Sequence, residues 1–282
     1  MATDPVRAPR GLGKLGWALV AWTVAAVVLL PLVWMVGTSL KPPLEYTTQS
    51  VSLLPDSPTL EHYRHLLIKD DVLGKLANSL IVTGGATVLA LACGFPAAYA
   101  LARMHLPRRV DVVFLLFVLL VKLTPPIAIA IPLYQVLRAL GLLDTLPGLI
   151  LVYQVYTLPF AIWMLLGFVR EVPRTYEEAA KADGAGLLTR LATIVLPLCI
   201  PGLIATGVFV AVLAWNEFLY ALLFIQTPSK FPLPTFIATL ITENEAFWGR
   251  LMGVGLLASL PILALVGVVQ RGLTRGFAGG LK

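Results

Sequence analysis

Lys122 and the Trp215-Asn216-Glu217 group are the strongly polar features inside otherwise apolar stretches of this sequence. Lys122 follows Asp111 by eleven residues, which is about 16 Å along a helix at 1.5 Å per residue. That distance places it near the middle of a bilayer, where a lysine costs about 2.5 to 3.5 kcal/mol. Each charge is therefore expected to face a water-filled cavity or a partner group.

Two interpretations of these residues remain open. In the first, Lys122 and Glu217 form a structural ion pair that locks two helices together. In the second, Asn216 and Glu217 hydrogen-bond a polar solute, and Trp215 and Tyr220 offer it an aromatic face. Amide and carboxylate groups in such a set bind hydroxyl groups without making or breaking a covalent bond.

The sequence contains no complete set of metal ligands, hydrolytic residues or phosphate-binding residues. His62 and His65 stand three apart on an expected helix, but no third ligand accompanies them or His105, so we predict no metal site and three surface histidines. No motif brings Ser and His candidates together for hydrolysis. The phosphate-binding pattern G-x-x-x-x-G-K-[ST] does not occur. We therefore predict no catalytic residue, and any ATP-derived energy must enter through another chain.

The elements that position these residues are predicted to be membrane helices. Hydrophobic residues make up 58% of the chain and charged residues only 13%, and the mean hydropathy is +0.87; soluble domains are about a quarter charged. A length of 282 residues accommodates about six spans of about 20 residues each. We expect an all-α polytopic membrane protein with six transmembrane helices, at about 15–36, 78–101, 110–131, 146–168, 197–225 and 251–269.

Loop charges predict the orientation of these spans. With the N-terminus inside, thirteen of the 21 Lys and Arg residues lie on the cytoplasmic side, seven lie outside, and Lys122 lies within a span. An excess of positive charge marks the cytoplasmic side. We therefore predict a cytoplasmic tail (1–13) and a single transmembrane domain (14–282) whose C-terminus is also cytoplasmic. The net charge of +6 sets topology in this interpretation and does not indicate a nucleic-acid partner.

The longest polar interruption between spans is the loop 173–196, which the same count places in the cytoplasm. Thr175 and Glu178 have the spacing of a capping box, in which the Thr begins a helix and the Glu binds back to the cap amide. Pro173 suits the position just before such a start. Gly184 can end the helix in a left-handed conformation. The pattern predicts a short helix, a glycine turn and a second helix.

This loop carries a family resemblance. Glu178-Ala179-Ala180, Gly184 four residues later, and then Ile194, Leu196 and Pro197 match the EAA…G…I.LP signature. The chain therefore resembles the permease subunits of binding-protein-dependent ABC importers. Asp183-Gly184-Ala185 and the terminal GLTRGFAGGLK are similar to the maltose-type, carbohydrate-importing branch, and the resemblance covers essentially the whole chain.

The resemblance implies the type I ABC importer transmembrane-domain fold and a role for the loop 173–196. In the family this loop is a coupling helix that docks on the ATP-binding subunit, which would make Glu178, Ala179, Ala180, Asp183 and Gly184 the docking residues. Similar permeases also carry a W-N-[ED] element at the position of Trp215-Asn216-Glu217. That element favours a substrate path formed by these residues with Tyr220, whereas Lys122 departs from the commoner pattern.

The implied partners are a second homologous permease, two ATP-binding subunits, an extracytoplasmic solute-binding protein and membrane lipid. ATP and Mg would bind the ATP-binding subunits, and no cofactor is expected on this chain. The implied function is ATP-driven import of a di- or oligosaccharide, such as trehalose or maltose, by alternating access through a bacterial or archaeal cytoplasmic membrane. Import of a polyol or a glycerol-phosphate-type solute is an alternative, as is a secondary transporter that needs no ATPase.

Overall fold

The computed structural model describes residues 13–46, 52–104, 109–241 and 247–279. Tertiary contacts divide the chain into two compact units, Met1–Asp70 with Ile241–Leu256 and Asp71–Leu240 with Leu257–Lys282. Four helices are long and apolar enough to cross a membrane, and two bent helix pairs raise this number to six in the described part of the chain. Six spans and an almost wholly helical structure agree with the predicted fold class.

The first unit contains α1 (Lys14–Ser39), the short 3-10 helix η1 (Pro43–Tyr46), α2 (Glu61–Ile68) and the first turns of α13 (Trp248–Gly279). The hydroxyl groups of Ser39 and Tyr63 lie 2.8 Å apart and join the end of α1 to α2. Arg250 lies 3.5 Å from the carboxylate of Asp70 and so connects α13 to the residues that follow α2. These polar contacts join the helices of the first unit, and they do not involve the apolar side chains along α1.

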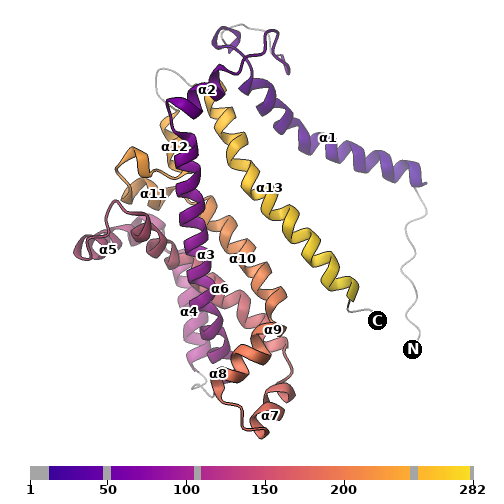
Figure 1. The fold of residues 1–282 in the computed structure, drawn as a ribbon, viewed down its shortest axis with the longest axis vertical. Coiled ribbons are helices and arrows are strands. Elements are labelled where there is room, and N and C mark those ends of the chain that lie inside the picture. Colours follow the sequence, from indigo (N-terminus) through magenta and orange to yellow (C-terminus); the bar gives the residue numbers. More distant parts are fainter. Residues whose placement is uncertain (1–12, 47–51, 105–108, 242–246, 280–282) are drawn as a thin grey trace. The chain divides into compact units, whose positions relative to one another are not determined.

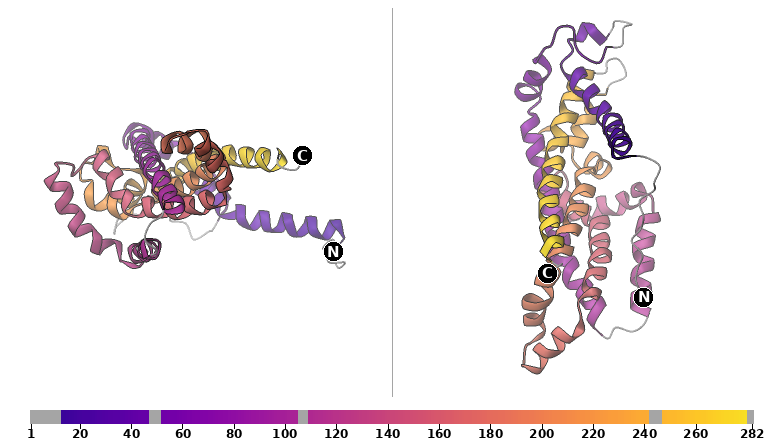
Figure 2. Two further views of the ribbon diagram at one scale, coloured as in Figure 1. Left: turned by 90° about the horizontal axis from the view of Figure 1, so that it is seen from below. Right: turned by 90° about the vertical axis from the view of Figure 1, so that its right-hand side faces the viewer.

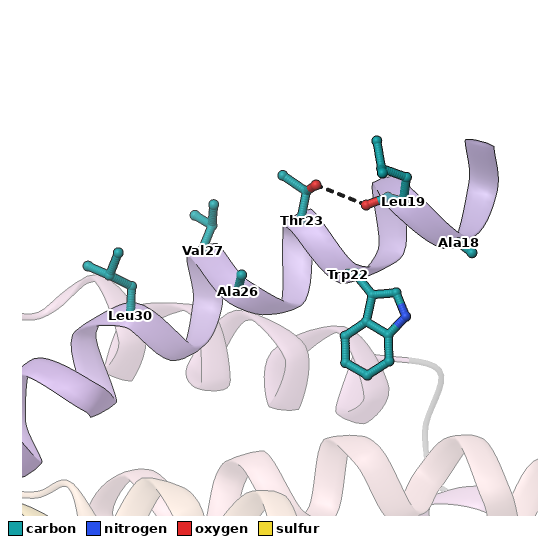
Figure 3. A pocket seen from close by; sticks show the side chains of 7 residues that line it. All are labelled: Ala18, Leu19, Trp22, Thr23, Ala26, Val27 and Leu30. Atoms are coloured by element: carbon teal, nitrogen blue, oxygen red, sulfur yellow. Dashed lines mark hydrogen bonds between the residues drawn. The ribbon is translucent and has the colours of Figure 1, made fainter. Parts of the chain in front are cut away.

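A shallow hollow of about 580 Å³ lies along α1 and is bordered by side chains of this one helix (Figure 3). The hydroxyl of Thr23 donates a hydrogen bond to the carbonyl oxygen of Leu19, and Trp22 is 76% exposed. An exposed, apolar surface without charges suits contact with lipid chains.

One histidine of the first unit is not where we predicted it. His62 is buried, with its Nε2 atom 2.8 Å from the carbonyl oxygen of Lys41 and 3.3 Å from the hydroxyl of Tyr46. Burial raises the pKa of Tyr46 to about 12. The expectation of a surface residue was wrong for His62, because Lys41, which follows α1, and Tyr46 of η1 hydrogen-bond its ring. His105 lies outside the described residues.

The second unit is built around α3 (Val72–Arg103), α6 (Leu146–Glu171) and α10 (Ile200–Trp215), which pack on one another (Figure 1). Small residues bring these helices close. A Cβ atom added at Gly94 of α3 would lie 3.3 Å from the Cβ of Ala161 on α6, and one at Gly202 of α10 would collide with the ring of Phe168. The glycines therefore set the distance between backbones in this bundle.

The third predicted span is broken, as expected, after Thr124. The chain forms α4 (Arg109–Leu123) and α5 (Pro126–Ala139), and the two axes differ in direction by 98°. Pro125 and Pro126 explain the break, because proline has no amide hydrogen to donate and excludes the helical conformation from the residue before it. The residues from 134 to 139, which we expected in a loop, are helical.

The fifth predicted span, 197–225, is not one continuous helix. It contains α9 (Leu196–Leu198), α10, a break at 216–218 and α11 (Leu219–Phe224). After α11 the chain continues through the 3-10 helix η3 (Pro228–Lys230) and α12 (Leu233–Thr239). Trp215-Asn216-Glu217 therefore lies at the end of a helix and not within one.

The loop between α6 and α10 forms α7 (Arg174–Ala182), α8 (Leu187–Arg190) and the π-helical turn η2 (Leu191–Val195) before α9. These elements lie at the lower end of the second unit in Figure 1, and the right-hand view of Figure 2 shows them projecting from the same end. A helix, a turn and a second helical segment agree with the pattern in the sequence. The cytoplasmic position of this end stays a prediction.

Candidate functional site

The helix α7 begins in a different way from the capping box we predicted. Arg174 is its first residue, Pro173 stands at the N-cap, and no side chain caps the helix. Thr175 therefore lies inside the first turn, where its hydroxyl cannot act as an N-cap. The start is shifted because proline, with its fixed φ and missing amide hydrogen, ends the preceding extended segment without a side-chain cap.

The end of α7 agrees with the prediction in detail. Gly184 has a φ of +88°, in the left-handed region. Its amide donates to the carbonyl of Lys181, and the amide of Ala185 donates to that of Ala180 at 2.9 Å. This is the Schellman arrangement, which favours glycine at that position. The chain is thereby turned sharply from α7 toward α8.

Most of the predicted docking residues lie at the surface of the protein. Glu178, Ala179, Asp183 and Gly184 are exposed, and Ala180 is partly exposed. An added Cβ atom at Gly184 would meet no atom within 4 Å. A short helix with small exposed side chains allows another protein surface to approach its backbone closely. The docking role of these residues stays a prediction.

Sequence reasoning missed the neighbouring Glu177, the buried residue of α7. Its Oε1 atom lies 2.6 Å from Nε of Arg103, and its Oε2 atom accepts a hydrogen bond of 2.7 Å from the hydroxyl of Tyr99. We call Tyr99, Arg103 and Glu177 the Glu177 clamp. A signal was present in the sequence, since Tyr99 and Arg103 are four residues apart and therefore share one face at the end of α3.

The predicted path residues gather at the break between α10 and α11. Glu217 accepts hydrogen bonds from the backbone amides of Tyr220, at 2.9 Å, and Ala221, at 3.3 Å. Asn216 is exposed, and its amide group donates to the carbonyl of Val212 at 2.8 Å. The carboxylate thus caps the first turn of α11, and the amide side chain closes the last turn of α10.

The two aromatic residues of this group are buried in this conformation. Trp215 is 6% exposed and Tyr220 is 3% exposed. The ring of Tyr220 stacks between those of Tyr156 on α6 and Phe224 on α11, with centroids 6.2 and 6.0 Å away. Asn216 is therefore the most exposed of the four residues, and Glu217 is partly exposed. Lys122 lies on α4, but its side chain lies outside the described part of the structure, so both interpretations of Lys122 stay predictions.

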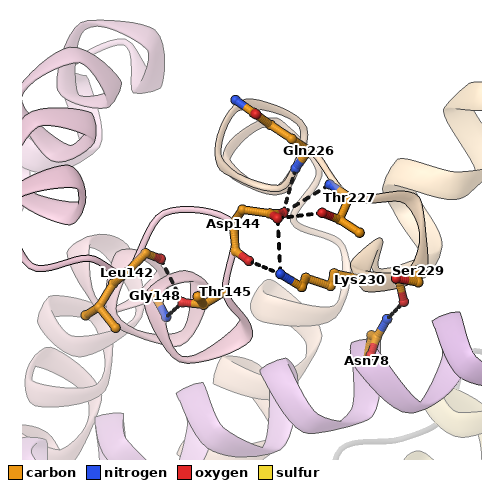
Figure 4. A network of polar contacts seen from close by, with 9 residues as sticks. All are labelled: Asn78, Leu142, Asp144, Thr145, Gly148, Gln226, Thr227, Ser229 and Lys230. Atoms are coloured by element: carbon orange, nitrogen blue, oxygen red, sulfur yellow. Dashed lines mark hydrogen bonds and ion pairs between the residues drawn. The ribbon is translucent and has the colours of Figure 1, made fainter.

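A second polar network lies at the start of α6 and just after α11 (Figure 4). In Figure 1, α11 lies toward the end of the second unit opposite α7. Asp144, just before α6, accepts hydrogen bonds from the amides of Gln226 and Thr227 and from the hydroxyl of Thr227 at 2.6 Å. Lys230 lies 3.1 Å from the same carboxylate. The hydrogen bond from the Thr227 hydroxyl is the main reason that the pKa of Asp144 lies well below its usual range. The network ties the start of α6 to the segment after α11, and sequence reasoning did not find it.

The family model of the binding-protein-dependent transport system inner membrane component matches residues 90–278. This range is more than half of the chain and includes α7, its glycine turn and the break at 216–218. The chain belongs to this family. It is accordingly an integral protein of the inner membrane and a permease of the ABC importer type.

Similar permeases match along nearly their whole length. The trehalose transport system permease protein SugB of Mycobacterium tuberculosis is 34% identical over 94% of this chain and 96% of the relative. The sulfoquinovosyl glycerol transport system permease protein SmoH of Agrobacterium fabrum is 34% identical over 92% of both. The trehalose/maltose transport system permease protein MalG of Thermococcus litoralis is 31% identical over 92% of this chain and 93% of the relative.

A solved structure shares the fold of the permease. It is a chain of a bacterial ABC transporter involved in the import of the acidic polysaccharide alginate, and it superposes with a TM-score of 0.75 over 91% of this chain and 95% of that chain. Its sequence is 21% identical, so the likeness concerns the fold. The likeness supports the type I importer architecture that the sequence resemblance implied.

Proposed function

We propose that this permease is one transmembrane subunit of an ATP-driven importer of a di- or oligosaccharide of the trehalose or maltose type. The observation that carries the proposal is the similarity, over more than nine-tenths of the chain, to permeases named for trehalose, maltose and a sugar glycoside. The chain would act with a second homologous permease, two ATP-binding subunits and a solute-binding protein outside the membrane. ATP and Mg would bind the ATP-binding subunits.

The mechanism would be alternating access. Closure of the two ATP-binding subunits would draw α7 of this chain toward its counterpart in the second permease, and the path near Asn216 would then open toward the binding protein. The exposed residues of α7 and the sharp turn at Gly184 support this role, because they offer a compact surface for docking.

The proposal is tested by uptake in cells that lack and regain this chain. We expect accumulation of radiolabelled trehalose or maltose to require the chain, to stop when arsenate depletes ATP and to survive a protonophore that collapses ion gradients. Uptake that stops with the protonophore but not with arsenate would indicate a secondary transporter. Dependence on the chain for sorbitol or glycerol 3-phosphate alone would replace the sugar with one of these solutes.

The proposed orientation places both termini and α7 in the cytoplasm and the Asp144 network outside. In intact cells we expect an impermeant thiol reagent to label Ser229→Cys, which lies in η3 next to this network, and to leave Lys181→Cys on α7 unlabelled. Both positions are exposed to solvent in the structure. Labelling of Lys181→Cys from outside would reverse the orientation and remove the coupling role.

A further inference from the structure

The Glu177 clamp connects α7 with helices that lie far from it in the sequence. Arg103 and Glu177 are 74 residues apart, and their side chains are only 9% and 7% exposed. Both oxygens of the carboxylate are used, one by the guanidinium group and one by the hydroxyl of Tyr99. Charge-assisted bonds of this length, shielded from water, fix both distance and direction.

Arg103 extends the connection to a third helix. One of its terminal nitrogens donates to the carbonyl oxygens of Val169, at 2.9 Å, and Val172, at 2.5 Å. These carbonyls belong to the C-terminal end of α6, where a helix leaves acceptors without partners and favours a cation. Arginine suits the position because its planar guanidinium group directs N–H donors from separate nitrogens at the carboxylate and at the carbonyls, whereas lysine has a single nitrogen.

The backbone of α7 has its main contacts with α8 and η2, the elements that follow it. Its connection to α3 runs through side chains, those of the clamp and that of Arg174, which donates to the carbonyl of Ala102 at 3.3 Å. The backbone joins α6 to α7 through Val172 and Pro173, and the Glu177 carboxylate adds a side-chain route by which a force on α7 reaches the ends of α3 and α6. The exposed Glu178 points to the surroundings and makes no such connection among the described contacts.

We propose that Glu177 is the positioning residue that makes α7 move as one body with α3 and α6. This inference rests on the proposed docking of an ATP-binding subunit on α7. Glu178, Ala179 and Gly184 receive the movement of that subunit, and the clamp passes it to the membrane helices. A loose clamp would let α7 follow the ATP-binding subunit while the helices stay behind, so ATP would be consumed without transport.

A distance measurement in the purified complex tests the rigid connection. Spin labels are placed on the exposed native Cys93 of α3 and on Ala182→Cys at the exposed end of α7, with the buried Cys199 changed to Ala. We expect the wild-type distance to be the same without nucleotide and in the vanadate-trapped ATP state. In Glu177→Gln, which loses the charge but keeps the shape, we expect a broader distribution that shifts between the two states.

The matching functional measurement is the number of trehalose or maltose molecules taken up per ATP hydrolysed in proteoliposomes. Couplings between sites are worth roughly 5- to 150-fold, so we expect this ratio to fall about fivefold or more in Glu177→Gln. Glu171→Gln is the control, because it makes the same chemical change on the exposed end of α6. The control should match the wild type in both measurements.

The proposal requires both effects, and a wild-type ratio or an unchanged distance distribution in Glu177→Gln overturns it. If Glu177→Gln does not fold, the pair Arg103→Met/Glu177→Leu is used, which leaves no unpaired buried charge. We expect this pair to restore assembly but not the uptake ratio; restoration of both would mean that the clamp only stabilises the fold. A failure of the proposed function looks different, since the wild-type chain would then copurify with no ATPase or would take up no trehalose or maltose.

Discussion

Replacing Gly184 with valine should abolish most uptake while leaving α7 helical. A β-branched residue in the left-handed region costs about 1 to 2 kcal/mol, and Gly184 has a φ of +88°. An added side chain would meet no atom within 4 Å, so the strain comes from the backbone and not from a clash. A loss of 1 to 2 kcal/mol lowers the population of the native turn by about 5- to 30-fold. Stimulation of ATP hydrolysis and sugar uptake in proteoliposomes measure the effect.

Two control variants separate strain from bulk. Gly184→Asn should keep most activity, because asparagine tolerates the left-handed conformation. Gly186→Val adds the same side chain two residues away, where φ is −66° and no atom lies within 4 Å of an added Cβ. Equal losses at 184 and 186 would assign the effect to bulk on the surface. Normal coupled uptake by Gly184→Val would contradict the docking role of the turn.

Replacing Glu217 with alanine should reduce uptake by about tenfold or more, because it leaves two backbone amides of α11 without an acceptor. An unsatisfied buried donor costs about 1 to 3 kcal/mol, and Glu217 accepts from the amides of both Tyr220 and Ala221. Glu217→Gln keeps one acceptor oxygen and should retain more of the α11 structure. Assembly and ATPase activity without substrate should stay near wild type in both variants, and uptake of radiolabelled sugar gives the comparison.

The outcome of this pair also decides between the two interpretations of the polar group. If Glu217→Gln lowers uptake as much as Glu217→Ala, the negative charge of Glu217 or its bond to the solute is required for uptake. The capping of α11 by this side chain would then not explain the loss. If both changes prevent assembly and the double change Lys122→Met/Glu217→Leu restores it, a structural ion pair is the correct interpretation. Asn216→Ala, which removes an exposed amide, should lower uptake without affecting assembly.

The sequence predicted those features that depend on neighbouring residues. Hydropathy indicated six spans, prolines marked the break after Thr124, and Gly184 marked the end of α7. Each of these is decided within one or two helical turns. Motif spacing also identified the loop 173–196 as the conspicuous element, although the predicted capping box was wrong because Pro173 starts the helix without one.

Features that depend on distant residues were not predicted. Glu177 and Glu178 are the same residue type side by side, and only the fold shows that Glu177 is buried against α3 and Glu178 is exposed. The break at 216–218 was hidden because apolar residues continue on both sides of it. Asn216 closes the last turn of α10, Glu217 accepts the hydrogen bonds that begin α11, and Tyr220 lies against α6.

The sequence separation within the Glu177 clamp has a consequence for how the protein is made. Arg103 leaves the ribosome 74 residues before Glu177, so α3 enters the membrane while the guanidinium group has no carboxylate partner. An unpaired positive charge next to a new span retains that end in the cytoplasm. In the proposed orientation Arg103 therefore acts twice, first as a charge that orients α3 during synthesis and later, once α7 has emerged, as a neutralised structural link.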